Sequence, residues 1–133
     1  VYYSMNRSII LIMIAVVFIA GIFVLVKSGN KPEQSTGQSN VSVTDGKQII
    51  EINAKGGYSP RNTIAKASLP TVIKVKTNGT FDCSSSLIIP SIGYRANLSA
   101  TGETTIALGS QKPGSSVKGI CGMGMYNFNV QFN

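Results

Sequence analysis

The sequence from residue 46 to residue 133 predicts an all-β domain, a β-sandwich built of short strands. Segments rich in β-branched and aromatic residues alternate with a period of two, and turn-forming residues separate them. No stretch after residue 45 has the periodicity of an α-helix. A chain of about 90 residues can form a hydrophobic core without a disulfide or a metal, so neither is required for folding.

An apolar run precedes this domain. Residues 9–26 are 18 consecutive residues without a polar side chain, flanked by Arg7 and Lys27. As an α-helix the run would be about 27 Å long, close to the roughly 30 Å of a bilayer's hydrocarbon core. It is longer than the apolar part of a signal peptide, and no small-residue cleavage pattern follows it. The sequence therefore predicts a single transmembrane helix after an N-terminal flank, 1–8, with a cleaved signal peptide or a buried helix as the alternatives.

The segment 27–45 is polar and rich in Ser, Gly, Asn and Gln, which predicts a flexible linker between the helix and the domain 46–133. Basic residues near the helix, Arg7 before it and Lys27 and Lys31 after it, slightly favour a domain that faces the cytoplasm. We therefore expect a single-pass protein of the cell membrane.

Five segments of the domain are expected to be strands. The clearest is the last, where Tyr, Phe and Val alternate with Asn and Gln, as in a strand with one buried face. In the second segment, Ile73 and Val75 are expected on the buried face, and Lys74 and Lys76 on the solvent side. The five segments are 47–53, 70–77, 86–90, 104–108 and 126–132.

Composition excludes several classes of function. From Lys47 onward the domain carries nine basic and three acidic side chains, a net charge of +6, which suits anionic lipid or an acidic protein partner. The basic residues are scattered and no recognition motif accompanies them, so we expect no nucleic-acid binding. A cysteine nucleophile would lack a histidine base, and no phosphate-binding loop or hydrolase serine motif is present. We therefore expect neither an enzyme nor a small-molecule substrate.

Sulfur-containing side chains are concentrated near the C-terminus. Cys121, Met123 and Met125 lie within five residues, separated by glycines, and Cys83 is the one other cysteine. Residues two apart project from the same face of a strand, and glycine permits a tight loop, so the three sulfurs can approach one point. Thiolates and thioethers without imidazole favour Cu(I). We predict that Cys83, Cys121, Met123 and Met125 bind Cu(I) between two loops at one end of the sandwich.

Other interpretations of the sulfurs stay open at this point. Cys83 and Cys121 could instead form a structural disulfide, worth about 3–4 kcal/mol by the loop-closure estimate, in a non-metal module at the cell surface. The methionines could fill gaps in the core, or the two cysteines could be buried and inert. Zinc is disfavoured because a structural site usually takes four Cys or His ligands, although Glu51 and Asp82 are conceivable additions.

Short motifs add a resemblance to a known fold family. The elements Gly57-Tyr58-Ser59-Pro60, Phe81-Asp82-Cys83 and Pro113-Gly114, followed by the segment 121–125, resemble a Greek-key cupredoxin domain. Blue-copper cupredoxins use two histidines, a cysteine and a methionine. Here Met123 or Gly124 stands roughly where the loop histidine would be, and Cys83 where the earlier histidine would be. A His₂Cys redox site therefore cannot be built.

With the N-terminal helix, the pattern is similar to the membrane-anchored cupredoxin-like Cu(I) chaperones of Gram-positive bacteria (the CupA type). The resemblance implies that Cys83, Cys121, Met123 and Met125 bind one or two Cu(I) ions that share the thiolates. It also implies a cytosol-facing domain and a copper-exporting P-type ATPase as the partner. The expected function is that of a membrane-tethered Cu(I) chaperone for copper resistance.

Overall fold

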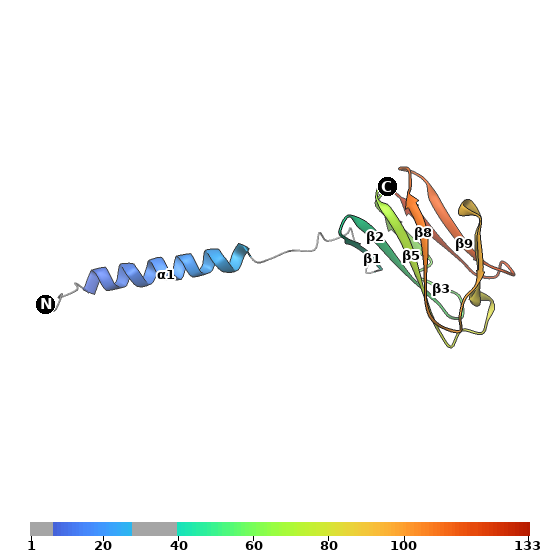
Figure 1. Cartoon of the computed structure of the whole chain (residues 1–133), viewed down its shortest axis with the longest axis horizontal. Coiled ribbons are helices and arrows are strands. Elements are labelled where there is room, and N and C mark those ends of the chain that lie inside the picture. The colour runs from blue at the N-terminus through green and yellow to red at the C-terminus, as the bar shows by residue number, and fades with distance from the viewer. Residues whose placement is uncertain (1–6, 28–39) are drawn as a thin grey trace. The chain divides into compact units, whose positions relative to one another are not determined.

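The computed structural model describes residues 7–27 and 40–133, which belong to two separate units (Figure 1). The apolar run 9–26 lies within an α-helix, α1 (Arg7–Lys27). Among the residues that the structure describes, no helix combines the length and the apolar character needed to cross a membrane. The structure thus contains the helix expected from the apolar run, but it does not support the membrane anchor predicted over 9–26. Most of the predicted linker, 28–39, lies outside the described residues.

The C-terminal unit is mostly β, with ten strands in two mixed five-stranded sheets (Figure 1). The first sheet has the order β1 (Val41–Thr44), β2 (Lys47–Ala54), β5 (Pro70–Asn78), β8 (Thr101–Ser110), and the short β3 (Tyr58–Ser59) pairs with β2. The second has the order β4 (Asn62–Ala65), β10 (Asn127–Phe132), β9 (Ser116–Cys121), β6 (Ser86–Ile89), β7 (Tyr94–Asn97). Two short 3₁₀ turns, η1 (Cys83–Ser85) and η2 (Pro90–Ile92), flank β6.

The five predicted strands are present as β2, β5, β6, β8 and β10. Strand β10 alternates as expected, with Phe128, Val130 and Phe132 buried and the residues between them partly exposed. Ile73 and Val75 are likewise completely buried in β5. Two pairings are parallel, β2 with β5 and β4 with β10, and the other pairings are antiparallel.

The core lies between the two sheets, and its polar members are satisfied. Gln48 is fully buried in β2, where its amide donates to Thr71 Oγ1 at 2.9 Å and to the Lys66 carbonyl at 3.0 Å. The Lys66 N–H donates in return to Gln48 Oε1 at 2.9 Å. Within the described residues, every buried side-chain nitrogen and oxygen has a hydrogen-bond partner, which avoids the cost of burying an unpaired polar group.

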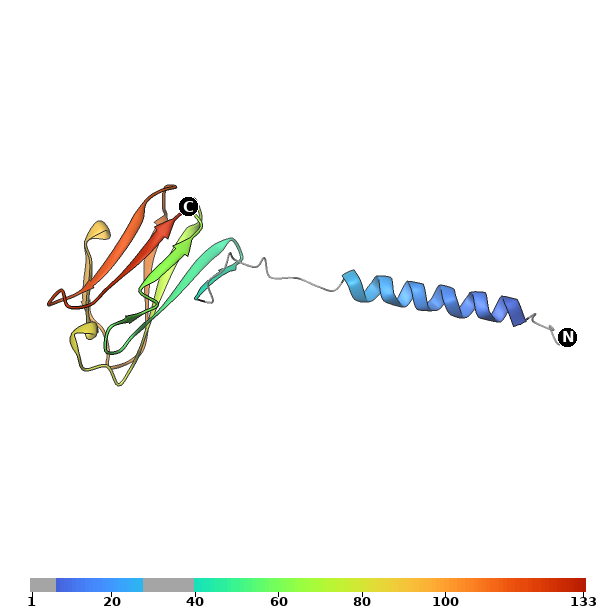
Figure 2. The same cartoon turned by 180° about the vertical axis from the view of Figure 1, so that it is seen from behind.

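The end of the sandwich that carries the sulfurs is formed by three connections. These are the β2–β3 turn, the η1 turn and the turn that joins β9 to β10. Both cartoon views draw the η1 turn beside the β9–β10 turn (Figure 2). The prediction that two inter-strand loops meet at one end of the domain is therefore confirmed by the bond between Cys83 and Cys121.

Candidate metal centre

The β9–β10 turn places three of the four predicted ligands. Cys121 is the last residue of β9, and its N–H donates to the Tyr126 carbonyl at 2.9 Å across the turn. The Gly124 N–H donates to the Cys121 carbonyl at 2.8 Å, and the Gly122 N–H donates to the Ser86 carbonyl of β6 at 2.9 Å. The turn is thus fixed within itself and to the neighbouring strand.

The structure explains the presence of glycine at residues 122 and 124 of this turn. A Cβ atom at residue 122 would lie 2.7 Å from Ser86 Oγ and 3.2 Å from Ser86 Cβ, so the Ser86 side chain would have to move. Gly124 has a φ of +73°, in the left-handed region that favours glycine. The close approach of the turn to β6 therefore favours glycine at residue 122, and the positive φ favours glycine at residue 124.

The methionines of the turn face solvent. Met123 is 74% exposed and Met125 is 63% exposed, whereas Cys121 between β9 and the turn is completely buried. The alternative in which the methionines fill the core is therefore wrong. Thioethers at these positions contribute almost nothing to the packing of the core.

Cys83 is positioned by its neighbour Asp82. The Asp82 carboxylate accepts hydrogen bonds from the N–H of Ser84 at 2.8 Å and from the Ser84 hydroxyl, and so caps the η1 turn. Its other oxygen accepts from the N–H of Gly56 at 2.5 Å, which links η1 to the β2–β3 turn. These hydrogen bonds stabilise the charged carboxylate and so hold the pKa of Asp82 below its usual value. The two from Ser84 lower it most, and the one from Gly56 adds to them.

Loss of the Asp82 carboxylate is expected to weaken the fold in a pH-dependent way. Because the pKa of Asp82 is lowered in the folded chain, its contribution is complete above about pH 4 and is lost as the pH falls through the lowered pKa. Asp82→Asn should therefore have a lower free energy of unfolding than wild type at neutral pH. The difference should shrink below about pH 4.

Urea denaturation of both chains between neutral pH and strong acid measures this. Asp45→Asn, in the exposed β1–β2 turn, is the control, because Asn also tolerates the positive φ found there. A difference for Asp82→Asn that stays constant with pH would contradict the assigned role.

The two cysteines are joined in the structure. Cys83 and Cys121 form a disulfide with their Cα atoms 5.7 Å apart and a sequence separation of 38 residues. The predicted convergence of the two sulfurs is found, but not as a pair of thiolates. A thiolate is the form of cysteine that binds metals, so the predicted copper site requires reduction of this bond. Among the described residues, no group of three or more Cys, His, Asp or Glu side chains is arranged to hold a metal ion.

Two tyrosines support the sulfur pair. The Tyr126 N–H donates to Cys121 Sγ at 3.3 Å. Tyr58 packs edge-on against Phe128, with ring centroids 5.3 Å apart, and its hydroxyl donates to the Ser84 carbonyl in η1 at 3.2 Å. Burial, with the nearby Asp82 carboxylate adding to it, raises the pKa of Tyr58 to about 12, so this tyrosine stays a neutral donor. In the sequence, Tyr58 stands out only as part of the motif Gly57–Pro60, and no local pattern predicts its contact with η1.

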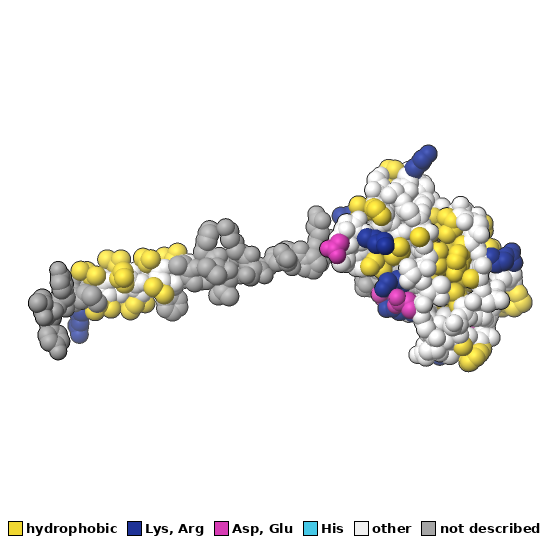
Figure 3. Space-filling view, viewed as in Figure 1, with side chains coloured by type: hydrophobic (Ala, Val, Ile, Leu, Met, Phe, Trp, Pro, Cys, Tyr) yellow, Lys and Arg dark blue, Asp and Glu magenta, His cyan; other side chains and the backbone are white. Residues whose placement is uncertain are grey.

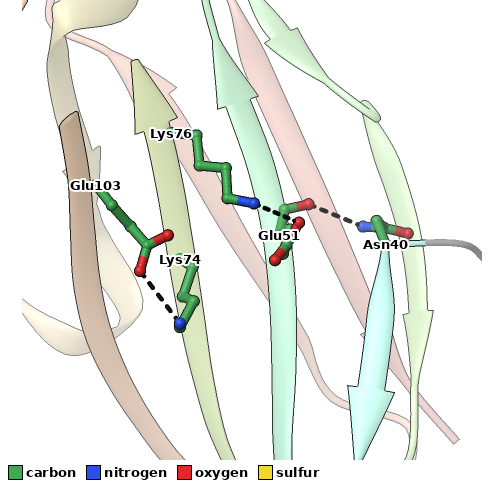
Figure 4. Close-up of polar contacts among 5 residues, drawn as sticks. All are labelled: Asn40, Glu51, Lys74, Lys76 and Glu103. Carbon is green, nitrogen blue, oxygen red and sulfur yellow. Dashed lines mark hydrogen bonds and ion pairs between the residues drawn. The ribbon is translucent and has the colours of Figure 1, made fainter. Parts of the chain in front are cut away.

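Glu51 is engaged away from the two cysteines, in an ion pair on the first sheet. It lies on β2, where its carboxylate pairs with Lys76 Nζ at 2.8 Å and its carbonyl accepts from Asn40 Nδ2 at 3.2 Å (Figure 4). Lys74 and Glu103 form a second pair on the same sheet, at 3.1 Å. The Glu51 side chain is therefore engaged in a surface ion pair across two strands, an interaction of small energetic weight. Asp82 is next to the site but is engaged in capping η1.

A cleft of about 380 Å³ adjoins the β9–β10 turn. Its wall includes the cations Lys55 and Arg61 and the Met125 side chain. The other residues that line it are Gly56, Gly57, Tyr58, Ser59, Tyr126 and Asn127. On the face drawn in Figure 3 the basic side chains are spread over the domain instead of forming one patch. The cleft therefore places two positive charges beside an exposed thioether.

Comparison with solved structures identifies the fold as cupredoxin-like. The chain is similar to the metal-binding domain of the Cu(I)-exporting P-type ATPase CopA of Streptococcus pneumoniae D39, solved with Cu(I) (22% identity, 75% of this chain and 99% of that chain, TM-score 0.62). It is also similar to a copper-binding protein in the apo form (22% identity, 74% of this chain and 100% of that chain, TM-score 0.64). Auracyanin B is a third similar structure (12% identity, 73% of this chain and 96% of that chain, TM-score 0.50). No family model matches the sequence, and no curated protein matched it.

Proposed function

We propose that the domain binds Cu(I) when the Cys83–Cys121 bond is reduced, and that it passes the ion to a Cu(I)-exporting P-type ATPase. The observation that carries the proposal is the convergence of two cysteines from separate turns, with Met123 and Met125 exposed on the same turn as Cys121. A donor set of sulfur alone, in a sequence without histidine, favours Cu(I) over Zn(II) and Cu(II). The similarity of fold to two copper-binding domains supports it.

The four sulfurs have different roles in this proposal. With Cα atoms 5.7 Å apart, the thiolates of Cys83 and Cys121 can ligate the same ion after reduction. The thioethers of Met123 and Met125 are neutral and weaker ligands, and they lie where an acceptor protein can reach them. Stepwise replacement of these labile ligands then moves the ion without releasing it into water.

A comparison of redox states tests the proposal directly. The whole chain is reduced with a phosphine, and Cu(I) is titrated against a chromophoric Cu(I) chelator. The reduced chain should withdraw copper from the chelator, and the oxidised chain should not, because disulfide sulfurs carry no thiolate charge. Failure of the reduced chain to compete would overturn the proposal. It would favour the second candidate, a module in which the disulfide is purely structural.

Substitution of the exposed methionines is expected to weaken copper binding without affecting the fold. Met123→Leu and Met125→Leu remove one neutral sulfur each, so we expect each to lower the Cu(I) affinity of the reduced chain by about tenfold. The free energy of unfolding should change by less than about 0.5 kcal/mol, because both side chains face solvent. Chelator competition and urea denaturation measure the two quantities. Equal affinity in wild type and in the variant Met123→Leu/Met125→Leu would remove the methionines from the site.

The charge of the cleft indicates how an acceptor would dock. Lys55 and Arg61 flank Met125, and the domain is strongly basic, so the acceptor surface is expected to be acidic. Lys55→Glu/Arg61→Glu should slow Cu(I) transfer to the metal-binding domain of a Cu(I) ATPase by about tenfold or more at low salt, and less at high salt. Lys112→Glu is the matched control. Lys112 lies in the loop before β9, and Cys121 is at the opposite end of that strand, so this charge is away from the cleft. Equal slowing by both variants would point to net charge instead of docking at the cleft.

A further inference from the structure

We propose that the Cys83–Cys121 bond is an exchangeable disulfide that a small thiolate of the glutathione type opens by attacking Cys83 Sγ. Cys83 is then the site of a mixed disulfide, and Cys121 is the leaving group. The inference deepens the proposed function, since copper binding requires both thiols, but its test uses no copper.

Access distinguishes the two sulfurs. Cys121 is completely buried at the end of β9, beneath the turn that leads to β10. Cys83 is partly exposed at the start of η1. Phe81, two residues earlier, is 86% exposed. Thiol–disulfide exchange occurs at the sulfur that the incoming thiolate can reach, and here that sulfur is Cys83.

Hydrogen bonding favours the same direction of cleavage. The thiolate that leaves must carry a negative charge, and a donor directed at it stabilises that charge. The Tyr126 N–H donates to Cys121 Sγ at 3.3 Å, so the thiolate that leaves as Cys121 has a donor directed at it. Tyr126 is held in the same turn by the backbone hydrogen bond from the Cys121 N–H to the Tyr126 carbonyl, at 2.9 Å. The donor is therefore in place before exchange begins.

The exchange balances with two molecules of thiol. The first thiolate bonds to Cys83 Sγ, the Cys83–Cys121 bond breaks, and its electron pair leaves with Cys121 as a thiolate. A second thiolate attacks the thiol-derived sulfur of the mixed disulfide and releases Cys83 as a thiolate. The two small thiols leave as their own disulfide, and so supply the two electrons that reduce the protein. The two protein thiolates then take up protons or ligate Cu(I).

Trapping of the intermediate tests the assignment. The oxidised chain is mixed briefly with glutathione, free thiols are blocked with N-ethylmaleimide, and tryptic peptides are analysed by mass spectrometry. Lysines and arginines between the two cysteines, Arg95 and Lys118 among them, put Cys83 and Cys121 on separate peptides. We expect glutathione on the Cys83 peptide, the maleimide on the Cys121 peptide, and one glutathione with one maleimide in the mass of the undigested chain. Glutathione on Cys121, or on both residues equally, would overturn the proposal, as would a bond that opens only after the chain is unfolded in urea.

Single-cysteine variants provide an independent measurement. With oxidised glutathione, reduced Cys121→Ser should form the mixed disulfide at Cys83 about tenfold faster or more than Cys83→Ser forms it at Cys121. In urea the two rates should become similar, which shows that the fold causes the difference. Equal rates in the folded chains would contradict the assignment. A phosphine reduces the disulfide without thiol exchange, so the copper titration and the exchange experiment are independent. A chain that exchanges thiols but does not bind copper would contradict the proposed function and would still agree with this inference.

Discussion

Replacing either cysteine with serine is expected to reduce the Cu(I) affinity of the reduced chain by more than about 100-fold. Loss of the hydrogen-bond partner of a metal ligand already lowers affinity by about 10–100-fold, and loss of a thiolate removes a ligand together with its charge. Cys83→Ser and Cys121→Ser each leave one thiolate and two thioethers, a set without the charge to hold Cu(I) against a strong chelator. Competition with a chromophoric chelator, under a phosphine reductant, measures the effect.

The control for this prediction must preserve the site and perturb its surroundings. Ser85→Ala removes a hydroxyl that donates to the Asp82 carbonyl within the same turn as Cys83, and it leaves all four sulfurs unchanged. We expect it to bind Cu(I) nearly as wild type does. Copper binding that survives in both cysteine variants would show that the metal lies elsewhere. Loss in one variant alone would indicate a site that uses only that cysteine.

Reduction of the disulfide is expected to lower the free energy of unfolding by about 4 kcal/mol. The bond closes a loop across a sequence separation of 38 residues, and the loop-closure estimate for this length gives that value. The loss is a large fraction of the stability of a small domain. Cu(I) should restore a comparable amount, about 4 kcal/mol at a free concentration 1,000 times the dissociation constant. Metal and disulfide would then be alternative cross-links between the same two turns.

Urea denaturation of three states tests this second prediction. These are the oxidised chain, the phosphine-reduced chain and the reduced chain with Cu(I) held by a chelator buffer. Cys83→Ser/Cys121→Ser is the matched control, because it should resemble the reduced chain and should not respond to copper. A reduced chain as stable as the oxidised chain would show that the bond does not constrain the unfolded state. A copper response in the double variant would place the stabilising ion outside this site.

The strands that sequence predicts best are those with a polar and a buried face. In β10 the alternation of Phe128, Val130 and Phe132 with Asn and Gln is present in the sequence and in the burial of the side chains. The shorter β3 and β4, of two and four residues, are too brief to show a period, and β4 exists because it pairs in parallel with β10 across a long sequence separation. Such pairing depends on tertiary contacts that no local pattern encodes.

Strand β1 shows a second limit of the sequence. Its residues lie within the polar stretch predicted as a linker, yet Val41 is buried because β1 pairs with β2 in the register that places Val41 opposite Ile50. Glu51 and Asp82 illustrate the same limit at the site. Both are carboxylates that a sequence offers as ligands, and only the fold shows that one faces Lys76 and the other caps η1.

The convergence of Cys83 and Cys121 was predictable, whereas their chemical state was not. The spacing of Cys121, Met123 and Met125 allowed a strand or a tight loop, and a cysteine just before a predicted strand suggested a second loop at the same end. Whether Cys83 and Cys121 are thiols or a disulfide depends on the redox conditions around the chain, which residue types do not determine. The burial that distinguishes the two sulfurs likewise comes only from the packing of β9.

The hydrogen bond between the Asp82 carboxylate and the Gly56 N–H has a consequence for regulation. Gly56 belongs to the wall of the cleft, and the same carboxylate holds the first turn of η1 that begins with Cys83. If a protein shifts Gly56 as it docks, it also disturbs the carboxylate that caps η1, the turn that begins with Cys83. By thermodynamic reciprocity, the docked protein and the ion then alter each other's affinity by the same factor. An acceptor that loosens this contact would thus promote release of its own cargo, without any separate trigger.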